Sequence, residues 1–177
     1  MTTKISGTDG IDVAQIRAAD GDPVAIAISG AGVVSFPVGE KKPIFSATQN
    51  AAQSLTSSAS KLLFQVEEFD PLNLFASSRF QPNVPGVYRI SGGLQVSGNT
   101  SSIFLAAYLN GVVSKYLTSV AITAGSLLSS PIIAGSCLIY LNGTTDYVEL
   151  WGASNSTLNT AAIGSTCYFQ ASYEGSA

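Results

Sequence analysis

The 177-residue sequence contains no histidine, and its charge comes from only 8 Lys and Arg and 11 Asp and Glu. Without an imidazole, a Ser-His-Asp triad, a Cys-His pair, a histidine metal site and a histidine pH switch are all excluded. With so few basic side chains and a formal net charge of -3, the chain also lacks the phosphate-neutralising charge that nucleic-acid binding requires. We therefore expect no nucleic-acid partner.

Several other signals are also missing. Residues 1–7 have no apolar core of a signal peptide, and the apolar runs are broken well before the roughly 20 residues that a membrane-spanning helix needs. No Gly-x-Ser-x-Gly elbow and no phosphate-binding glycine motif occurs. We expect synthesis in a cytoplasm, no membrane insertion, no metal or other cofactor, and no enzymatic activity.

Cysteine is scarce, with only Cys137 and Cys167, 30 residues apart. That spacing matches no metal-ligand pattern, and both residues lie in apolar, strand-like surroundings. A reducing cytosol disfavours a disulfide, so buried free thiols are the favoured interpretation, with a Cys137–Cys167 bond as the alternative.

What the sequence does contain is a succession of short apolar runs separated by turn residues, and no convincing amphipathic helix. The best helix candidate, residues 46–61, has Leu55 as its single large apolar residue, so it is interpreted as strand and loop. Asn110-Gly111 and Asn142-Gly143 each follow an apolar run and predict type I′ hairpins. Residues 43–177 are therefore predicted to be an all-β domain of about eight or more strands, a sandwich or jelly roll.

Residues 1–42 form a different region, rich in Gly, Asp and Ala and with little aromatic content. So short a segment cannot bury a core alone, so we expect it to pair with other copies or with a partner. We predict a β-rich attachment or stalk segment whose apolar residues make the contact: Ile11, Val13, Ile16, Ile26 and Ile28.

The larger region resembles the C1q/TNF-like jelly-roll domains. The residues that carry the resemblance are Phe69-Asp70, Phe75, Phe80, the turn Val84-Pro85-Gly86-Val87-Tyr88, the hairpin Leu109-Asn110-Gly111, the segment 138–150 and the closing strand 169–173. Asn142-Gly143 stands where the family usually has Gly-Asp, and Ala171 where it usually has Gly. The resemblance implies a jelly roll and, because C1q-like domains are typically trimers, a homotrimer.

Residues 5–12 and 32–37 resemble the Gly/Asp-punctuated stalk pieces of bacteriophage tail fibres and other virion appendages. This resemblance implies a virion protein with other virion proteins as partners. We expect a fibre or tip protein that attaches through its N-terminus and binds host surface polysaccharide. The alternatives are a capsid decoration, cement or head-fibre protein, and a bacterial C1q-like adhesive protein.

Ligand-binding residues are expected in loops at one end of the domain, around 99–102, 114–119 and 155–159, because recognition usually lies on loops over a rigid scaffold. Their Ser, Thr, Asn and Tyr content suits hydrogen bonding to polysaccharide. The candidates are Asn99, Ser101, Lys115, Tyr116, Asn155 and Asn159.

Overall fold

The computed structural model describes residues 27–28, 34–35, 42–122 and 128–176. The chain divides into two units, Met1–Lys41 and Lys42–Ala177, which are described separately. In the first, β1 (Ala27–Ile28) and β2 (Val34–Ser35) pair antiparallel. Of the predicted attachment residues, Ile28 lies in β1, and the other four lie outside the described residues: Ile11, Val13, Ile16 and Ile26.

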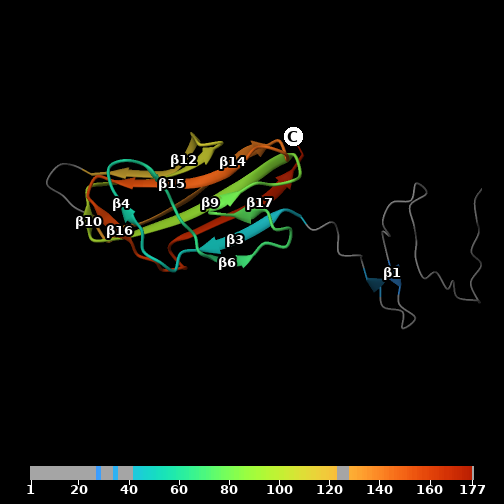
Figure 1. Cartoon of the computed structure of the whole chain (residues 1–177), viewed down its shortest axis with the longest axis horizontal. Helices are drawn as coiled ribbons and strands as arrows, with labels where there is room; N and C mark the ends of the chain where they lie inside the picture. The colour runs from blue at the N-terminus through green and yellow to red at the C-terminus, as the bar shows by residue number, and fades with distance from the viewer. Residues whose placement is uncertain (1–26, 29–33, 36–41, 123–127, 177) are drawn as a thin grey trace, which may run out of the picture. The chain divides into compact units, whose positions relative to one another are not determined.

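The larger unit is a sandwich of two antiparallel sheets (Figure 1). The first sheet has the order β4 (Ser54–Leu55), β16 (Leu158–Thr160), β9 (Gly86–Ser97), β17 (Tyr168–Gly175), β3 (Ile44–Thr48) and β6 (Val66–Phe69), and β14 (Ile132–Leu141) also pairs with β9. We call it sheet I. Its central strand is β9, which pairs with three others that come from distant parts of the sequence.

The second sheet has the order β12 (Val112–Ala121), β11 (Ser102–Leu109), β15 (Val148–Ser154), β8 (Arg79–Phe80) and β7 (Phe75–Ala76), with β5 (Ser60–Lys61) also on β15. We call it sheet II. A separate pair joins β10 (Asn99–Thr100) to β13 (Leu128–Ser129). β4, β10 and β16 gather at the end of the domain opposite the end where β17 finishes (Figure 1).

Alternating side chains from the two sheets form the core between them. Phe45 of β3 lies at its centre, 1% exposed, with its ring 4.7–4.8 Å from the rings of Phe75, Phe80 and Phe169. Stacked and edge-on aromatic contacts of this kind add to the free energy gained by burial alone. Every second residue of the long strands points away from this core, which gives each sheet an outer face.

The predicted turn at Asn110-Gly111 is confirmed. Both residues have positive φ, +54° and +80°, as a type I′ turn requires, and the turn joins β11 to β12. The prediction that residues 46–61 are strand and loop is also confirmed, since this stretch contains the end of β3 and the two-residue strands β4 and β5. No helix occurs among residues 42–122 and 128–176.

The predicted hairpin at Asn142-Gly143 is wrong. β14 and β15 belong to different sheets and are joined by the six-residue connection 142–147. The Asn142 side-chain oxygen accepts hydrogen bonds from the backbone N–H groups of Thr144, Thr145 and Asp146, at 2.9–3.0 Å. Asn142 therefore organises a longer connection from one sheet to the other, as Asn side chains often do in turns.

Both cysteines are free thiols, as favoured from the sequence. Cys167 is buried and Cys137 is half-buried in β14.

Candidate functional site

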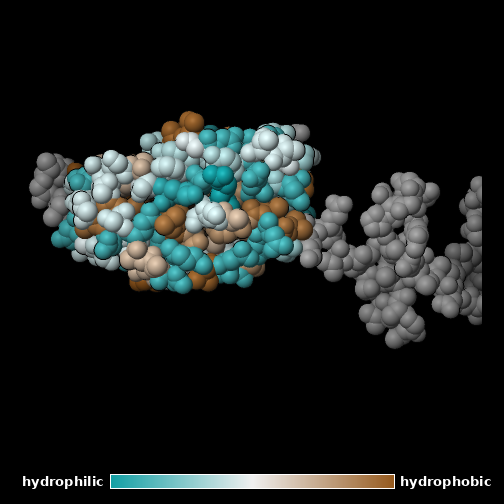
Figure 2. Space-filling view, viewed as in Figure 1, coloured by the Kyte–Doolittle hydropathy of each residue, from teal (hydrophilic) through white to brown (hydrophobic). Residues whose placement is uncertain are grey.

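The outer face of sheet I carries exposed apolar side chains. The alternation along β3 and β14, and a register shift in the pairing of β6 with β3, direct them away from the core. Each is 37–58% exposed: Ile44, Val66, Phe69, Ile132, Leu138 and Tyr140. Figure 2 shows apolar patches among the hydrophilic surface on one side of the molecule. Exposed apolar residues that gather on one face are typical of protein–protein contact surfaces.

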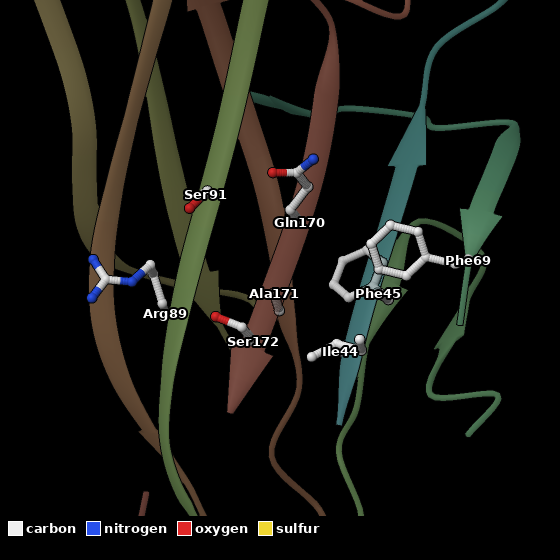
Figure 3. A pocket seen from close by; sticks show the side chains of 8 residues that line it. All are labelled: Ile44, Phe45, Phe69, Arg89, Ser91, Gln170, Ala171 and Ser172. Carbon is white, nitrogen blue, oxygen red and sulfur yellow. The ribbon is translucent and has the colours of Figure 1, made fainter. Parts of the chain in front are cut away.

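A hollow of about 270 Å³ lies on this face, across β3, β17 and β9. Its lining combines Ile44 and Phe69 with the polar side chains of Ser91, Gln170 and Ser172 and with the charged side chain of Arg89, which pairs with Glu174. The Phe69 ring extends from β6 over β3 (Figure 3). The hollow can thus receive an apolar side chain from another molecule.

Hydrogen-bonded polar side chains occupy the middle of the same face. Gln170 Nε2 donates to Ser46 Oγ at 3.1 Å, and Ser46 Oγ donates to Glu68 Oε2 at 2.5 Å. Protein contact surfaces combine apolar contacts with hydrogen bonds of defined direction. The row of Gln170, Ser46 and Glu68 can therefore fix the position of a neighbouring molecule, while the apolar residues stabilise the contact.

The edge where β12 begins, after the Asn110-Gly111 turn, is a second apolar surface. Val112 and Val113 are 68% and 44% exposed, although they lie within a strand. Together with the exposed β14 side chains, they give the larger unit two separate apolar surfaces, a sheet face and a strand edge.

The outer face of sheet II is different, because it holds a buried carboxylate. Glu149 of β15 is 3% exposed, and its Oε1 accepts hydrogen bonds from Lys61 Nζ at 3.3 Å and from Arg79 at 3.1–3.2 Å. Its Oε2 accepts one from Trp151 Nε1 at 3.1 Å. Burial raises the pKa of Glu149, but the hydrogen bonds from Trp151 and Arg79 and the charge of Lys61 outweigh it, so the pKa lies below its ordinary value.

Aromatic rings surround this cluster. Tyr108 of β11 stacks on Trp151, with centroids 4.6 Å apart and planes at 15°. Phe104, four residues earlier on the same face, meets Tyr116 of β12 edge-on at 5.3 Å. The Arg79 guanidinium lies 3.7 Å over the Tyr147 ring, the geometry of a cation–π contact. The outer face of sheet II is thus a fixed arrangement of half-exposed rings.

Two of the predicted ligand-binding residues lie together. Asn155 Oδ1 accepts hydrogen bonds from Thr100 Oγ1 at 2.6 Å and from the backbone N–H groups of Ser101 and Ser102 at 3.2 and 3.1 Å. Its Nδ2 donates to Ser101 Oγ at 2.6 Å. Asn155 and Ser101 therefore form one hydrogen-bonded rim at the end of sheet II.

The other four predicted residues lie elsewhere. Asn99 is in β10, and Asn159 is in β16, paired with Ser54 and Ser97 in sheet I. Lys115 and Tyr116 belong to β12, so the expectation that 114–119 is a loop is wrong. β12 continues through these residues with two irregularities in its pairing with β11, and polar residues there reflect its exposed edge position.

Sequence reasoning missed the Glu149 cluster and the role of Phe104. Residues 147–151 alternate in polarity along the strand, but a Glu in such a strand is typical of a solvent-facing position. Its partners Lys61 and Arg79 come from segments 88 and 70 residues away, and no local pattern connects them.

No group of three or more acidic, Cys or His side chains close enough to bind a metal occurs in the described part of the chain. The same residues contain no helix of the length and apolar character needed to cross a membrane.

The comparisons with known proteins concern the fold. No protein-family model and no curated protein matches the chain. Solved structures do: murine APRIL matches with a TM-score of 0.55 at 9% identity over 75% of this chain and 99% of that one. Eiger TNF from S. frugiperda matches with a TM-score of 0.57 at 6% identity over 78% and 96%. The chain thus has an all-β jelly-roll fold like that of these TNF-family proteins.

Proposed function

We propose that the chain is a non-enzymatic, homotrimeric structural protein of a bacteriophage particle, of the fibre or tip type. Residues 1–42 attach it to the particle, and the jelly roll binds glycan on the host surface. Three jelly rolls that meet a repetitive surface together bind with avidity, so a weak contact at each is sufficient.

The observation that carries the proposal is the pair of apolar surfaces on one jelly roll. A ring of identical subunits needs two different surfaces on each copy, because every contact is head-to-tail. The outer face of sheet I and the Val112–Val113 edge provide such a pair. The hollow beside Phe69 supports this arrangement, since it offers the face a place to receive an apolar side chain from the neighbouring edge.

The particle role rests on the sequence of the first unit, whose Gly/Asp-punctuated segments resemble virion stalk pieces. Deletion of residues 1–40 should leave a folded trimer that no longer incorporates into particles. Loss of folding on this deletion would contradict the proposal that residues 1–42 serve attachment and that the jelly roll folds without them.

The trimer is tested by native mass spectrometry at micromolar concentration. We expect a mass close to three times 18.2 kDa. A clean monomer would overturn the trimer and, with it, the avidity on which glycan binding at the host surface depends.

The attachment role is tested by binding of purified trimer to intact candidate host cells, with and without competing surface polysaccharide. Saturable binding that the polysaccharide competes supports a fibre or tip protein. If the folded trimer binds no cells but decorates particles that lack it, the protein is a capsid decoration protein and the proposed attachment role is wrong.

A further inference from the structure

We propose that the outer face of sheet II binds an uncharged segment of the host glycan, with one sugar ring in the hollow beside Phe104. This inference rests on the proposed attachment function and locates its site. The hollow measures about 110 Å³ and is lined by Ser57, Ser102, Phe104, Ala153, Ser154 and Asn155. Pockets for drug-sized ligands are usually roughly 300–1,000 Å³, so this hollow suits one ring of a longer ligand.

The lining has the two components that sugar recognition uses. The half-buried Phe104 ring provides an apolar surface, and hydroxyl and amide groups surround it. Within the part of the chain that the structure describes, no hydrogen bond uses the side-chain hydroxyl of Ser57 or Ser102. These hydroxyls are available to the hydroxyl groups of a sugar.

The polar rim is held in place before any ligand arrives. Asn155 Oδ1 accepts three hydrogen bonds from residues 100–102, and Ser154 Oγ donates to Thr100 Oγ1 at 2.9 Å in a buried contact. The Phe104 ring is fixed by its edge-on contact with Tyr116. A pre-formed site loses little entropy on binding, which matters for a weak ligand such as one sugar ring.

The aromatic surface continues beyond the hollow. Trp151 precedes Ala153 by two residues on β15, so its Cα lies about 7 Å along the strand on the same face. Its stacked partner Tyr108 extends the aromatic row along β11. A glycan chain that leaves the hollow along the strands therefore meets further half-exposed rings.

Charge on this face favours an uncharged ligand. None of the six residues that line the hollow is ionisable. The nearby acid, Glu149, is already paired with Lys61 and Arg79, and its contacts with them occupy one carboxylate oxygen. An acidic sugar would meet no unpaired cation in the hollow.

The site also fits the trimer. The surfaces that we assign to self-association are the outer face of sheet I and the β12 edge near the turn. The hollow lies on the outer face of sheet II, between β11, β15 and the connection 56–59, and none of the residues named for the two association surfaces lines it.

The single tryptophan of the chain, Trp151, reports on this face. The full-length trimer is titrated with the neutral and the acidic polysaccharide fractions, separated by ion exchange from the cells that it binds. We expect the neutral fraction to change Trp151 emission saturably and the acidic fraction to leave it unchanged.

Two variants place the site. Ser57→Tyr fills the hollow from an exposed position, and Phe104→Ala removes its apolar wall; each should weaken neutral-glycan binding about tenfold or more, measured by calorimetry. Ser97→Ala, an exposed position on sheet I that was not among the candidate binding residues, is the control and should bind as the wild type does. Native mass and thermal unfolding verify that Ser57→Tyr remains a folded trimer.

The outcomes separate the two levels of the proposal. If the cells are bound but only the acidic fraction binds, or if Ser57→Tyr binds the neutral fraction as tightly as the wild type, this site assignment fails and the attachment function stands. If the trimer binds no cells, the proposed function itself fails.

Discussion

The two outer faces of the jelly roll are built in opposite ways. Sheet I presents exposed aliphatic and aromatic side chains around a short polar row, whereas sheet II presents rings fixed by one another and by a buried carboxylate with three donors. An apolar face with few fixed positions suits a protein neighbour that supplies complementary groups. A face whose side chains are already fixed suits a small ligand. Binding then orders few further side chains, so the small contact free energy of such a ligand is sufficient.

The largest effect is expected from a charge on sheet I. Leu138→Asp places a second carboxylate beside Arg89, which already pairs with Glu174, in the middle of the proposed contact, where desolvation of the added charge is costly. Leu138 is 52% exposed in the single chain, so the jelly roll itself should still fold. We expect sedimentation velocity to show monomers where the wild type sediments as trimers.

The matched control is Ile163→Asp, since Ile163 is similarly exposed at 48% but lies in the connection between β16 and β17, outside the strands of both sheets. It should remain trimeric. Equal dissociation by both variants would mean that sheet I has no special role.

The next effect concerns Glu149. Glu149→Gln removes the charge that Arg79 and Lys61 share and places an amide next to them, which should reduce the free energy of unfolding by about 1–3 kcal/mol, as expected for hydrogen bonds to charged groups. Chemical denaturation of the two proteins measures it. Glu174→Gln, which affects the exposed pair of Arg89 and Glu174, should have a smaller effect; the reverse order would contradict the contrast between the faces.

The same carboxylate predicts a pH dependence. The pKa of Glu149 in the folded protein lies below its ordinary value of 4.5, so its contribution to stability is fully present above about pH 4.5 and is lost as the pH falls through the lowered pKa. The stability of the wild type should therefore fall more steeply below pH 4.5 than that of Glu149→Gln. If the thermal unfolding temperatures of the wild type and of Glu149→Gln fall in parallel below pH 4.5, Glu149 contributes nothing to the pH dependence of stability.

The smallest effect should come from the stacked rings. A double-mutant cycle with Tyr108→Ala and Trp151→Ala should give a coupling of about 0.5–1.5 kcal/mol, typical of aromatic pairs. A second cycle that pairs Tyr108→Ala with Ile163→Ala should give coupling within about 0.5 kcal/mol of zero, because the two residues share no contact. Zero coupling in the first cycle would mean that the two stacked rings do not stabilise each other.

Local signals allowed much of the fold to be predicted. The conformation of Asn110-Gly111 depends on two residues with positive φ, and the sequence shows both. Asn142-Gly143 is the same dipeptide, but the connection that it forms depends on which sheet the next strand joins. Contacts between distant segments decide that. The all-β fold could thus be predicted more reliably than the pairing of its strands.

The candidate sites were harder to predict because each combines separate segments. Asn155 and Ser101 were expected, since polar loop residues are common in binding sites, and they lie on one rim. Phe104 belongs to an apolar strand, and in the sequence alone such a position is typical of a core residue. Only the pairing of β11 with β15 shows that it points outward beside Asn155.

The position of β17 has a consequence for biosynthesis. This strand lies between β9 and β3 in sheet I, although residues 98–167 separate it from β9 in the sequence. While a ribosome is still adding residues 98–167, β9 and β3 lack the strand that joins them. Sheet I therefore completes late in synthesis, and its apolar residues are exposed to aggregation until then. Chaperone demand should accordingly be highest for nascent chains that stop short of residue 168.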